Sequence, residues 1–307
     1  MKDTILFGDC RETLKEFDEK ARCCVTSPPY YGLRDYGGED SQIGQEQTPE
    51  EYIEEMVNVF RLVRDCLTDD GTLWLNIGDS YYNYRKDGCI PKQTFSANRQ
   101  DLPVTTPRRS NKLNGYKDKD LIGIPWMLAF ALRADGWYLR QDIIWHKPNP
   151  MPESVRDRCT KSHEYIFLLS KNKNYYYDND AIKEPAKDWG TRDRSNGKYH
   201  NPGSGLTPHS GLTKSYSKRN KRSVWSINKK PYKGAHFATY PEELITPCIK
   251  AGSDKGDIIL DPFMGSGTTA VVAKDLGRYY IGCELHEDYG ELIKKRLGLY
   301  ASLKSVH

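Results

Sequence analysis

Two short segments, far apart in the chain, combine polar, aromatic and glycine residues in patterns that could do chemistry. One is Thr-Ser-Pro-Pro-Tyr at residues 26–30, and the other is Asp-Pro-Phe-Met-Gly-Ser-Gly-Thr-Thr at residues 261–269. Each follows a short apolar run, at 22–25 and at 258–260, of the kind that forms a buried strand. Ligands in an open α/β sheet usually bind just beyond the carboxyl ends of strands, so each segment predicts a binding site.

The first segment is poor in hydrogen-bond donors. Pro28 and Pro29 have fixed φ angles and no backbone N–H. The acceptors that remain are chiefly the Pro28 carbonyl and the Ser27 hydroxyl, beside the ring of Tyr30. Such a set suits an exocyclic amino group, which has two hydrogens to donate, on a flat base that can stack. A proline-stiffened turn that merely ends a strand is the simpler alternative.

The second segment is suited to a nucleoside cofactor. Gly265 and Gly267 allow positive φ and a close approach of the backbone to a ligand, and the free N–H groups at the start of a helix favour a negatively charged group. Glu284 ends the next predicted strand, where an acid typically binds ribose hydroxyls. A phosphate-binding loop would need a Lys after the glycines, and a dinucleotide site would need Gly-x-Gly-x-x-Gly. S-adenosylmethionine and a simple helix-capping turn both remain open.

Composition narrows the class of protein. The chain has 307 residues, of which 37% are hydrophobic and 29% are charged, and it could form one large domain with an insertion. No apolar run approaches the roughly 20 residues of a membrane-spanning helix, and the N-terminus leads directly into a strand, so we expect neither a membrane segment nor a signal peptide. The eight cysteines include no Cys-x-x-Cys pair, which indicates reduced thiols in a cytoplasmic protein and no metal site.

Positive charge is concentrated in one part of the chain. Residues 181–235 contain 13 Lys/Arg and 3 Asp/Glu, a net charge of +10, whereas the rest of the chain has a net charge of −6. The same stretch contains five Trp or Tyr residues. Lys and Arg neutralise phosphates and aromatic rings stack on bases, so this composition favours a nucleic-acid surface. A solvated basic loop without a partner is the alternative.

Apolar periodicity predicts strands alternating with helices, which is typical of a mostly parallel sheet covered on both faces. The strands Tyr138–Trp145 and Glu164–Leu169 have no helix between them, so part of the sheet should be antiparallel. Residues 84–120 and 181–235 match neither pattern, and we expect them to be mobile or functional loops. The remaining predicted strands are 4–7, 22–26, 72–77, 257–260 and 279–283, and the predicted helices are 11–17, 49–67, 124–133, 241–249, 266–276 and 288–297.

In their order along the chain, these motifs resemble those of the amino-group DNA methyltransferases. Ser-Pro-Pro-Tyr at 27–30 is similar to the catalytic (Asp/Asn/Ser)-Pro-Pro-(Tyr/Phe) of that family, and residues 261–269 resemble its S-adenosylmethionine motif. Residues 236–244 resemble the segment that packs over the methionine part of the cofactor, and Gly-Asp-Cys at 8–10 resembles the piece near the adenine. A catalytic motif first, a basic segment next and a cofactor motif last is the circularly permuted order of the family's β group.

The resemblance implies a Rossmann-like α/β fold with an inserted target-recognition region. Residues 1–180 would form the catalytic half, 181–235 the target-recognition insertion and 236–307 the cofactor-binding half. The implied catalytic residues, which would hold a base flipped out of duplex DNA, are Ser27, Pro28, Pro29 and Tyr30. The implied cofactor contacts are Asp9, His236, Phe237, Asp261, Pro262, Phe263, Gly265, Ser266, Gly267, Thr268, Thr269 and Glu284. The implied DNA contacts are Lys214, Lys218, Arg219, Lys221 and Arg222.

Ser at the first position of the catalytic motif is typical of the family's N4-cytosine enzymes, so Ser27 favours cytosine N4 over adenine N6 as the methylated atom. C5-cytosine methylation needs a Cys nucleophile, but Pro247-Cys248 lies on a predicted helix before the cofactor strand, where a core thiol is expected. An RNA or protein amino-group methyltransferase is a further alternative, and so is a non-catalytic DNA-binding protein of the same fold. The long basic, aromatic segment argues against a protein substrate, and the intact pair of motifs argues against a loss of catalysis.

The expected protein is therefore an S-adenosylmethionine-dependent methyltransferase of duplex DNA that needs no metal. We expect it in the cytoplasm, associated with the nucleoid, as a prokaryotic or phage-encoded enzyme. A cognate restriction endonuclease is a candidate partner. The recognition sequence and the oligomeric state do not follow from these residues.

Overall fold

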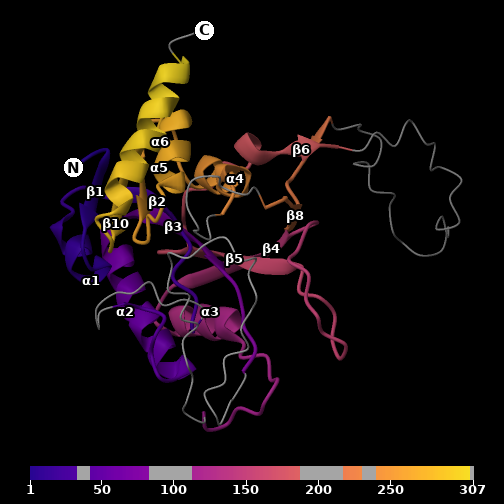
Figure 1. The fold of residues 1–307 in the computed structure, drawn as a ribbon. Coiled ribbons are helices and arrows are strands. Elements are labelled where there is room, and N and C mark those ends of the chain that lie inside the picture. Colours follow the sequence, from indigo (N-terminus) through magenta and orange to yellow (C-terminus); the bar gives the residue numbers. More distant parts are fainter. Residues whose placement is uncertain (33–41, 83–112, 187–216, 230–239, 305–307) are drawn as a thin grey trace, which may run out of the picture.

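Eight strands form one central sheet with helices packed on both of its faces (Figure 1). The computed structural model describes residues 1–32, 42–82, 113–186, 217–229 and 240–304. A sheet sandwiched between helices confirms the α/β fold class that the alternating sequence pattern predicts.

The elements lie close to the positions that apolar periodicity gives them. The strands of the main sheet are β1 (Thr4–Phe7), β2 (Ala21–Thr26), β3 (Leu67–Ile77), β4 (Tyr138–His146), β5 (His163–Ser170), β8 (Val224–Ser226), β9 (Ile258–Asp261) and β10 (Tyr279–Glu284). The α-helices are α1 (Cys10–Thr13), α2 (Pro49–Cys66), α3 (Ile124–Ala134), α4 (Glu242–Gly252), α5 (Thr268–Asp275) and α6 (Tyr289–Lys304). Two 3-10 turns, η1 (Leu14–Glu16) and η2 (Asp180–Ile182), and a small second sheet of β6 (Glu184–Pro185) with β7 (Lys218–Arg219) complete the described elements. No helix in the described part of the chain is long and apolar enough to span a bilayer.

The strand order in the main sheet is β1-β10-β9-β2-β3-β5-β4-β8. The first five strands of this order are parallel, β5 is antiparallel to both β3 and β4, and β8 is parallel to β4. The antiparallel β4–β5 pair confirms the expectation drawn from the lack of a helix between these strands. Since parallel strands end at the same edge, the segments after β2 and β9 begin side by side. This edge is called the carboxyl edge below.

Helix α2 shows how directly a local sequence sets an element. The Thr48 hydroxyl accepts a hydrogen bond from the Glu51 backbone N–H at 3.2 Å, and the Glu51 carboxylate accepts one from the Thr48 N–H at 3.1 Å. This reciprocal capping box, followed by Pro49 in the first turn, fixes where the helix begins. Thr48 is therefore the N-cap of α2. The buried face of α2 includes Tyr52, Ile53, Met56, Val59, Phe60 and Val63.

The sheet separates two hydrophobic cores. Helices α1, α2 and α3 contribute to the core on one face, and α4, α5 and α6 to the core on the other (Figure 1). Strand β2 shows the division, since Cys24 packs in the first core whereas Cys23 and Val25 pack in the second. Burial on both faces explains why the central strands are continuous apolar runs rather than alternating ones.

Two features of the sheet differ from the sequence prediction. The strand predicted at 72–77 begins earlier, at Leu67, and its pairing with β2 is irregular, because Ala21 pairs with Leu67 whereas Cys23 pairs with Thr72. Strand β8 has only three residues, too few to show a period, and it is defined by its pairing with β4. The basic stretch at 181–235 therefore supplies an edge strand of the main sheet as well as both strands of the small β6–β7 sheet.

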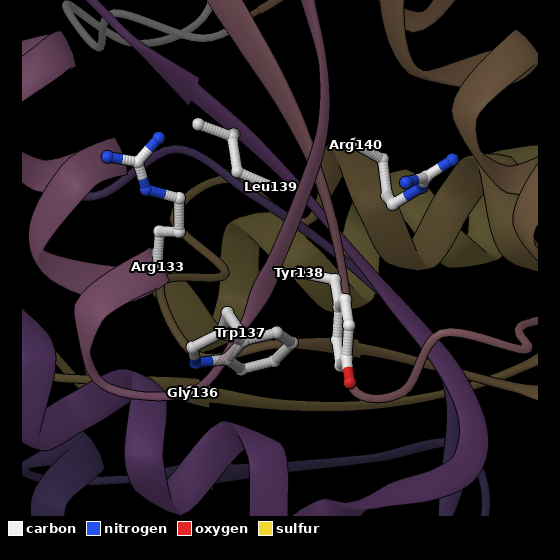
Figure 2. Close-up of a pocket in the computed structure, with 6 residues that line it drawn as sticks. All are labelled: Arg133, Gly136, Trp137, Tyr138, Leu139 and Arg140. Carbon is white, nitrogen blue, oxygen red and sulfur yellow. The ribbon is translucent and has the colours of Figure 1, made fainter.

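A hollow of about 420 Å³ lies at the opposite edge of the sheet, where β4 begins (Figure 2). Arg133 of α3 and Arg140 of β4 lie on either side of it, with Trp137 and Tyr138 between them. The hollow contains no residue of either sequence motif. It is therefore separate from the carboxyl edge, where both motifs lie.

Candidate active site

The two motifs meet at the carboxyl edge because β2 and β9 are neighbours. Cys23 pairs with Ile259 and Cys24 with Leu260, so the base turn (residues 26–30) and the glycine turn (residues 261–269) leave adjacent strands. Strands β10 and β1 continue the sheet beyond the glycine turn, and β3, β5 and β4 continue it beyond the base turn. The structure thus brings together the two segments that the sequence singles out.

Asp261 joins the base turn to the glycine turn. Its Oδ1 accepts from the Thr26 hydroxyl at 2.6 Å and from the Phe263 backbone N–H at 3.0 Å. Its Oδ2 accepts from the hydroxyls of Thr269 at 2.6 Å and Tyr240 at 3.0 Å. Burial raises the pKa of this fully buried carboxyl, and the four donors oppose that rise. All four partners belong to the protein, and three of them lie in the two turns, so the carboxylate that the family resemblance assigns to the cofactor site also joins the base turn to the glycine turn.

The two glycines of the turn are needed for different physical reasons. Among the described residues, a Cβ at Gly265, where φ is +54°, would meet only the Phe263 carbonyl at 3.9 Å, so this part of the structure leaves open space beside the glycine. A Cβ at Gly267, where φ is +80°, would lie 3.0 Å from Cγ2 of Ile293 in α6. The first glycine therefore leaves room for a ligand, and the second leaves room for a helix.

Arg296 of α6 holds the hydroxyl side chains of the turn. Its Nη1 donates to the Ser266 carbonyl at 2.8 Å, to the Ser266 hydroxyl at 2.7 Å and to the Thr268 hydroxyl at 3.0 Å. Its Nη2 donates to Glu242 of α4 at 3.3 Å. Arg296 thus fixes the orientation of the Ser266 and Thr268 side chains, whose hydroxyl groups accept its hydrogens and keep their own to donate. Sequence patterns do not single out Arg296, because a helix rich in Lys and Arg is typical of a solvent-exposed surface.

Glu284 lies at the end of β10, beside the glycine turn. Its Oε2 accepts from the Gly265 N–H at 2.7 Å, and its Oε1 accepts from the His286 N–H at 3.0 Å. The residue is 6% exposed, and burial raises its pKa from the ordinary 4.5 to about 7 although both N–H donors oppose the shift. A carboxylate has lone pairs beyond those two bonds, so Glu284 can also accept from hydroxyls of a ligand.

Asp9 begins α1 directly after β1. Its carboxylate accepts from the Arg11 backbone N–H at 2.8 Å and from the Arg11 Nε at 3.0 and 2.9 Å. Burial acts to raise the pKa of Asp9, but the hydrogen bonds from Arg11 outweigh it and hold that pKa below its ordinary value. The Gly8 N–H donates to the Glu284 carbonyl at 2.8 Å, so Asp9 follows a strand that is fastened beside Glu284.

Neighbouring strands and helices fix the base turn from several sides. The Tyr30 hydroxyl donates to Glu164 Oε2 at 2.9 Å, and the Tyr52 hydroxyl of α2 donates to the Pro29 carbonyl at 2.8 Å. A Cβ at Gly78 would lie 2.7 Å from Cε2 of the Tyr30 ring, so only glycine lets the ring lie there. Ser27 is partly buried between these supports. The turn therefore has a defined shape that does not depend on a ligand.

Sequence reasoning missed the charged residues behind Tyr30. Lys147 follows β4 and forms an ion pair with Glu164 of β5, and their side chains are 7% and 18% exposed. Asn76 of β3 donates to the same carboxylate at 3.5 Å. Single charged residues at strand ends have no distinctive spacing. The signal in the sequence was the position of Lys147 and Glu164. Lys147 follows β4 and Glu164 lies near the start of β5, and both strands reach the carboxyl edge at these points.

Four of the predicted DNA contacts lie within the described residues, beside the last strand of the sheet. Lys218 and Arg219 form β7, where Arg219 pairs with Glu184 of β6 at 3.0 Å. The Lys221 ammonium lies 4.9 Å from the centroid of the Trp225 ring in β8. The fourth predicted contact, Arg222, has an exposed side chain.

Three further predicted residues, Lys214, His236 and Phe237, lie outside the described residues. Within the described ranges, no group of three or more His, Cys, Asp or Glu side chains could hold a metal ion. Cys248 is fully buried in the core beneath α4, and burial raises its pKa well above the ordinary value, as expected for a structural thiol.

The fold and the site define a class of protein, the DNA methylases. The chain belongs to this family, because the family's N6/N4 methyltransferase model matches residues 21–295. That span includes both turns. A particular relative is the Type II methyltransferase M.SmaI of Serratia marcescens, which is 48% identical over 294 residues. The alignment covers 95% of this chain and 90% of the relative.

Two solved structures share the fold over nearly the whole chain. The PvuII DNA methyltransferase, whose title describes it as cytosine-N4-specific, aligns with a TM-score of 0.63 at 17% identity and covers 96% of this chain and 86% of that one. A protein of Thermus thermophilus, described as a putative DNA modification methylase complexed with S-adenosyl-L-methionine, aligns with a TM-score of 0.56 at 24% identity. It covers 95% of this chain and 91% of that one. These likenesses confirm the methyltransferase fold expected from the motifs.

Proposed function

We propose that this protein transfers a methyl group from S-adenosylmethionine to the exocyclic amino group of a base in duplex DNA, with cytosine N4 as the favoured acceptor. The observation that carries the proposal is the junction at Asp261, whose carboxylate bonds Thr26 of the base turn and Thr269 of the glycine turn. Methyl transfer needs a donor and an acceptor held in contact, and two joined turns on adjacent strands supply neighbouring sites for them.

The glycine turn fits a nucleoside cofactor. The open space beside Gly265 would let a ligand approach the backbone, and Glu284 would accept from its ribose hydroxyls. Asp9 would border the adenine, and the partly exposed Phe263 would contact the cofactor from the turn. When bound, S-adenosylmethionine supplies a methyl group that its sulfonium already activates. Asp261, Ser266 and Thr268 would act indirectly, by fixing the shape of the turn.

The base turn would hold the target amino group by its acceptors. The Ser27 hydroxyl and the Pro28 carbonyl would each accept one amino hydrogen, which draws the nitrogen lone pair out of conjugation with the ring. Tyr30 would offer its ring to the face of the base. The amino group of a paired base lies inside the duplex, so the base must be flipped out to reach this turn. These residues would therefore accelerate transfer mainly by orientation and electrostatics.

Cytosine is favoured by the residue type at position 27. Ser rather than Asp or Asn opens the catalytic motif, which is the pattern of the N4-cytosine enzymes that the motif resembles. The PvuII enzyme, described as cytosine-N4-specific, shares the fold. Adenine N6 is the alternative acceptor, since the family model covers both chemistries.

Duplex DNA would bind along the basic residues beside β8. Reversing the charges there should weaken DNA binding and reduce its dependence on salt, because fewer counterions would be released. The residues to reverse are Lys218, Lys221 and Arg222. A slope of log affinity against log salt that stays at the wild-type value would exclude this surface. Reversal of Lys274 and Lys294, on helices α5 and α6, serves as a control for the general effect of charge reversal.

The relatives also bear on partners. The Serratia relative is named a Type II methyltransferase, and the family resemblance implies a cognate restriction endonuclease as a candidate partner. We therefore propose a restriction endonuclease of the same sequence specificity as the partner activity, and a cytoplasmic location with the DNA of a bacterium or its phage.

The decisive test uses a Ser27→Ala, Tyr30→Ala double variant. It should lose transfer of labelled methyl groups to DNA and bind S-adenosylmethionine about as tightly as the wild type. Tyr138→Ala, at the opposite edge of the sheet, should retain both properties. Full activity in the double variant would exclude the proposed site. Sequencing of DNA methylated by the wild type, with a readout that separates N4-methylcytosine from N6-methyladenine, would give the base and the recognition sequence together.

A further inference from the structure

The loop between β4 and β5 projects from the carboxyl edge beside the base turn (Figure 1). This β4–β5 loop spans residues 147–162. Its first residue, Lys147, forms an ion pair with Glu164, and Glu164 accepts a hydrogen bond from the Tyr30 hydroxyl at 2.9 Å. The loop therefore starts next to the side chains that contact Tyr30, and a duplex that delivers a base to Tyr30 would pass close to it.

Prolines make the first half of this loop stiff. Three of them, Pro148, Pro150 and Pro152, have fixed φ angles. Asn149 and Met151 each precede a proline, which disfavours a helical backbone at both residues. Five consecutive residues therefore have few backbone conformations to lose when the loop meets a partner.

Hydrogen bonds fasten both halves of the loop to neighbouring segments. On the first half, the Asn149 side chain accepts from the Lys229 N–H at 3.2 Å and donates to the Lys229 carbonyl at 3.5 Å. On the second half, the Lys161 ammonium donates to the Asp79 carbonyl at 2.8 Å. The loop is thus held between the segment that follows β8, where the predicted DNA contacts lie, and the segment that follows β3.

The stiff half presents an apolar side chain to solvent. Met151 is 69% exposed, the largest fraction among the exposed large hydrophobic residues that the structure describes. Four residues span at most about 14 Å, so its Cα lies within that distance of the Lys147 Cα. The exposed Arg156 in the same loop supplies a cation for a phosphate. One exposed apolar residue needs no explanation by itself, but its place on a fastened loop beside the base turn gives it a use.

Base flipping creates a need that such a side chain meets. A base that leaves the duplex gives up its stacking and leaves a space between its former neighbours. Proteins that deform duplex DNA frequently insert apolar side chains between base steps, and Met and Pro are among the residues used. A Met side chain is unbranched and adapts to an irregular gap. Met151, with a proline on each side, is of this type.

We propose that Met151 is a wedge that enters the base stack of the bound duplex and fills the space left by the flipped base. This inference rests on the proposed function and adds to it the group that keeps the base out of the stack. The prolines and the bonds of Asn149 position the wedge before DNA binds, so that insertion loses little conformational entropy.

The test compares two duplexes that carry the recognition sequence, with S-adenosylhomocysteine present so that no transfer occurs. One is the ordinary duplex. In the other, a pyrene nucleotide replaces the base opposite the target, and its large ring fills the space in the stack. Met151→Ala should bind the ordinary duplex about tenfold more weakly than the wild type does, as expected for truncating one buried Met side chain. On the pyrene duplex the two proteins should differ by less than about twofold, because no space is left for the wedge.

Two variants serve as controls. Met151→Leu should stay within about threefold of the wild type on the ordinary duplex, because Leu is apolar and of similar volume. Tyr138→Ala, which truncates a side chain that is 45% exposed at the opposite edge of the sheet, should bind both duplexes as the wild type does. Since Met151 is exposed, Met151→Ala should also leave the midpoint of urea unfolding unchanged.

Two results would overturn the inference. One is an equal loss of affinity for both duplexes in Met151→Ala, which would assign Met151 to a contact outside the base stack. The other is an unchanged affinity of this variant for the ordinary duplex. A wild-type protein that methylates no DNA would refute the proposed function itself, whereas an active wild type with either of these results would refute only the wedge.

Discussion

The protonation of Glu284 should make cofactor binding depend on pH. Its carboxyl has a pKa of about 7 because it is buried, and it lies beside the glycine turn. About a tenth of the protein would carry the ionised carboxylate at pH 6, and about nine-tenths at pH 8. If ribose hydroxyls donate to the ionised form alone, the affinity for S-adenosylmethionine should rise about tenfold between these two values, which is about 1.4 kcal/mol.

The raised pKa of Glu284 also makes the stability of the folded protein depend on pH. Stability falls as the pH rises, whereas the affinity for the cofactor increases. A carboxyl whose pKa is raised on folding favours the folded state while it is protonated. Its contribution is complete below about pH 4.5, the ordinary value, and is lost as the pH rises through 7. The full difference is at most about 3 kcal/mol, with little screening for a residue that is 6% exposed. The ligand-free protein should therefore lose this contribution near the pH at which it gains affinity.

The assay is titration calorimetry with S-adenosylmethionine at pH 6, 7 and 8 and constant ionic strength, on the wild type and on Glu284→Gln. Gln keeps the shape and an acceptor for the Gly265 N–H but has no proton to lose. The ligand's own amino group titrates in a similar range, so the difference between the two proteins is decisive. Parallel pH profiles for wild type and variant would refute the reasoning.

Three more changes test other parts of the structure. Thr26→Val keeps the volume of the side chain but removes a donor to the buried Asp261 carboxylate, so urea unfolding should show a loss of about 2 kcal/mol together with slower methyl transfer. Gly282→Ala would press a methyl group against Met264 and lie 3.0 Å from the Asp261 carbonyl, and urea unfolding should show a loss of about 1–3 kcal/mol. Cys159 is the one exposed thiol among the described cysteines, so a thiol reagent should modify it in the folded protein and reach the six buried ones only after unfolding.

Each of these changes has a control. Thr4→Val loses a hydroxyl bond to the Lys2 carbonyl near the surface and should change stability by less than about 0.5 kcal/mol. Gly298→Ala in α6 should be neutral or stabilising, because no atom of the described residues lies within 4 Å of the added carbon. Because Cys89 lies outside the described residues, the thiol count is made in a Cys89→Ser background. If a control variant lost as much stability as the variant with which it is compared, the contact tested by that variant would not explain the loss.

The sequence predicts the fold well where an element carries its own signals. Helix α2 has a capping box and a long apolar stripe, and both β2 and β9 are apolar runs that end in polar turns. Strand β8 has none of these signals, because its pairing with β4 depends on residues about 80 positions away, as in the contact between His146 and Ser226. Local periodicity cannot show a strand that exists only through its partner.

The active site, like the fold, has parts that the sequence predicts and parts that it does not predict. The acceptors of the base turn and the open glycine turn follow from residue types and spacing. The partners that hold them do not, since Arg296, Glu164 and Lys147 are charged residues of ordinary appearance that tertiary contacts bring to the turns. The bonds from the Asp261 carboxylate to protein groups do not follow from the sequence either, because the fold buries this side chain between neighbouring strands and no sequence pattern reports that burial.

The bond between Thr26 and Asp261 joins residues 235 positions apart, and this separation has a consequence for how the protein is made. The ribosome releases β1 and β2 early, but β1 pairs only with β10 among the described strands, and β2 has β9 on one side. Until the last fifth of the chain has emerged, the base turn lacks its support and the edge of β2 is open to other strands. A chain terminated before β9 and β10 would therefore be inactive towards DNA and prone to aggregate, so each molecule acquires its activity only after these two strands have been synthesised.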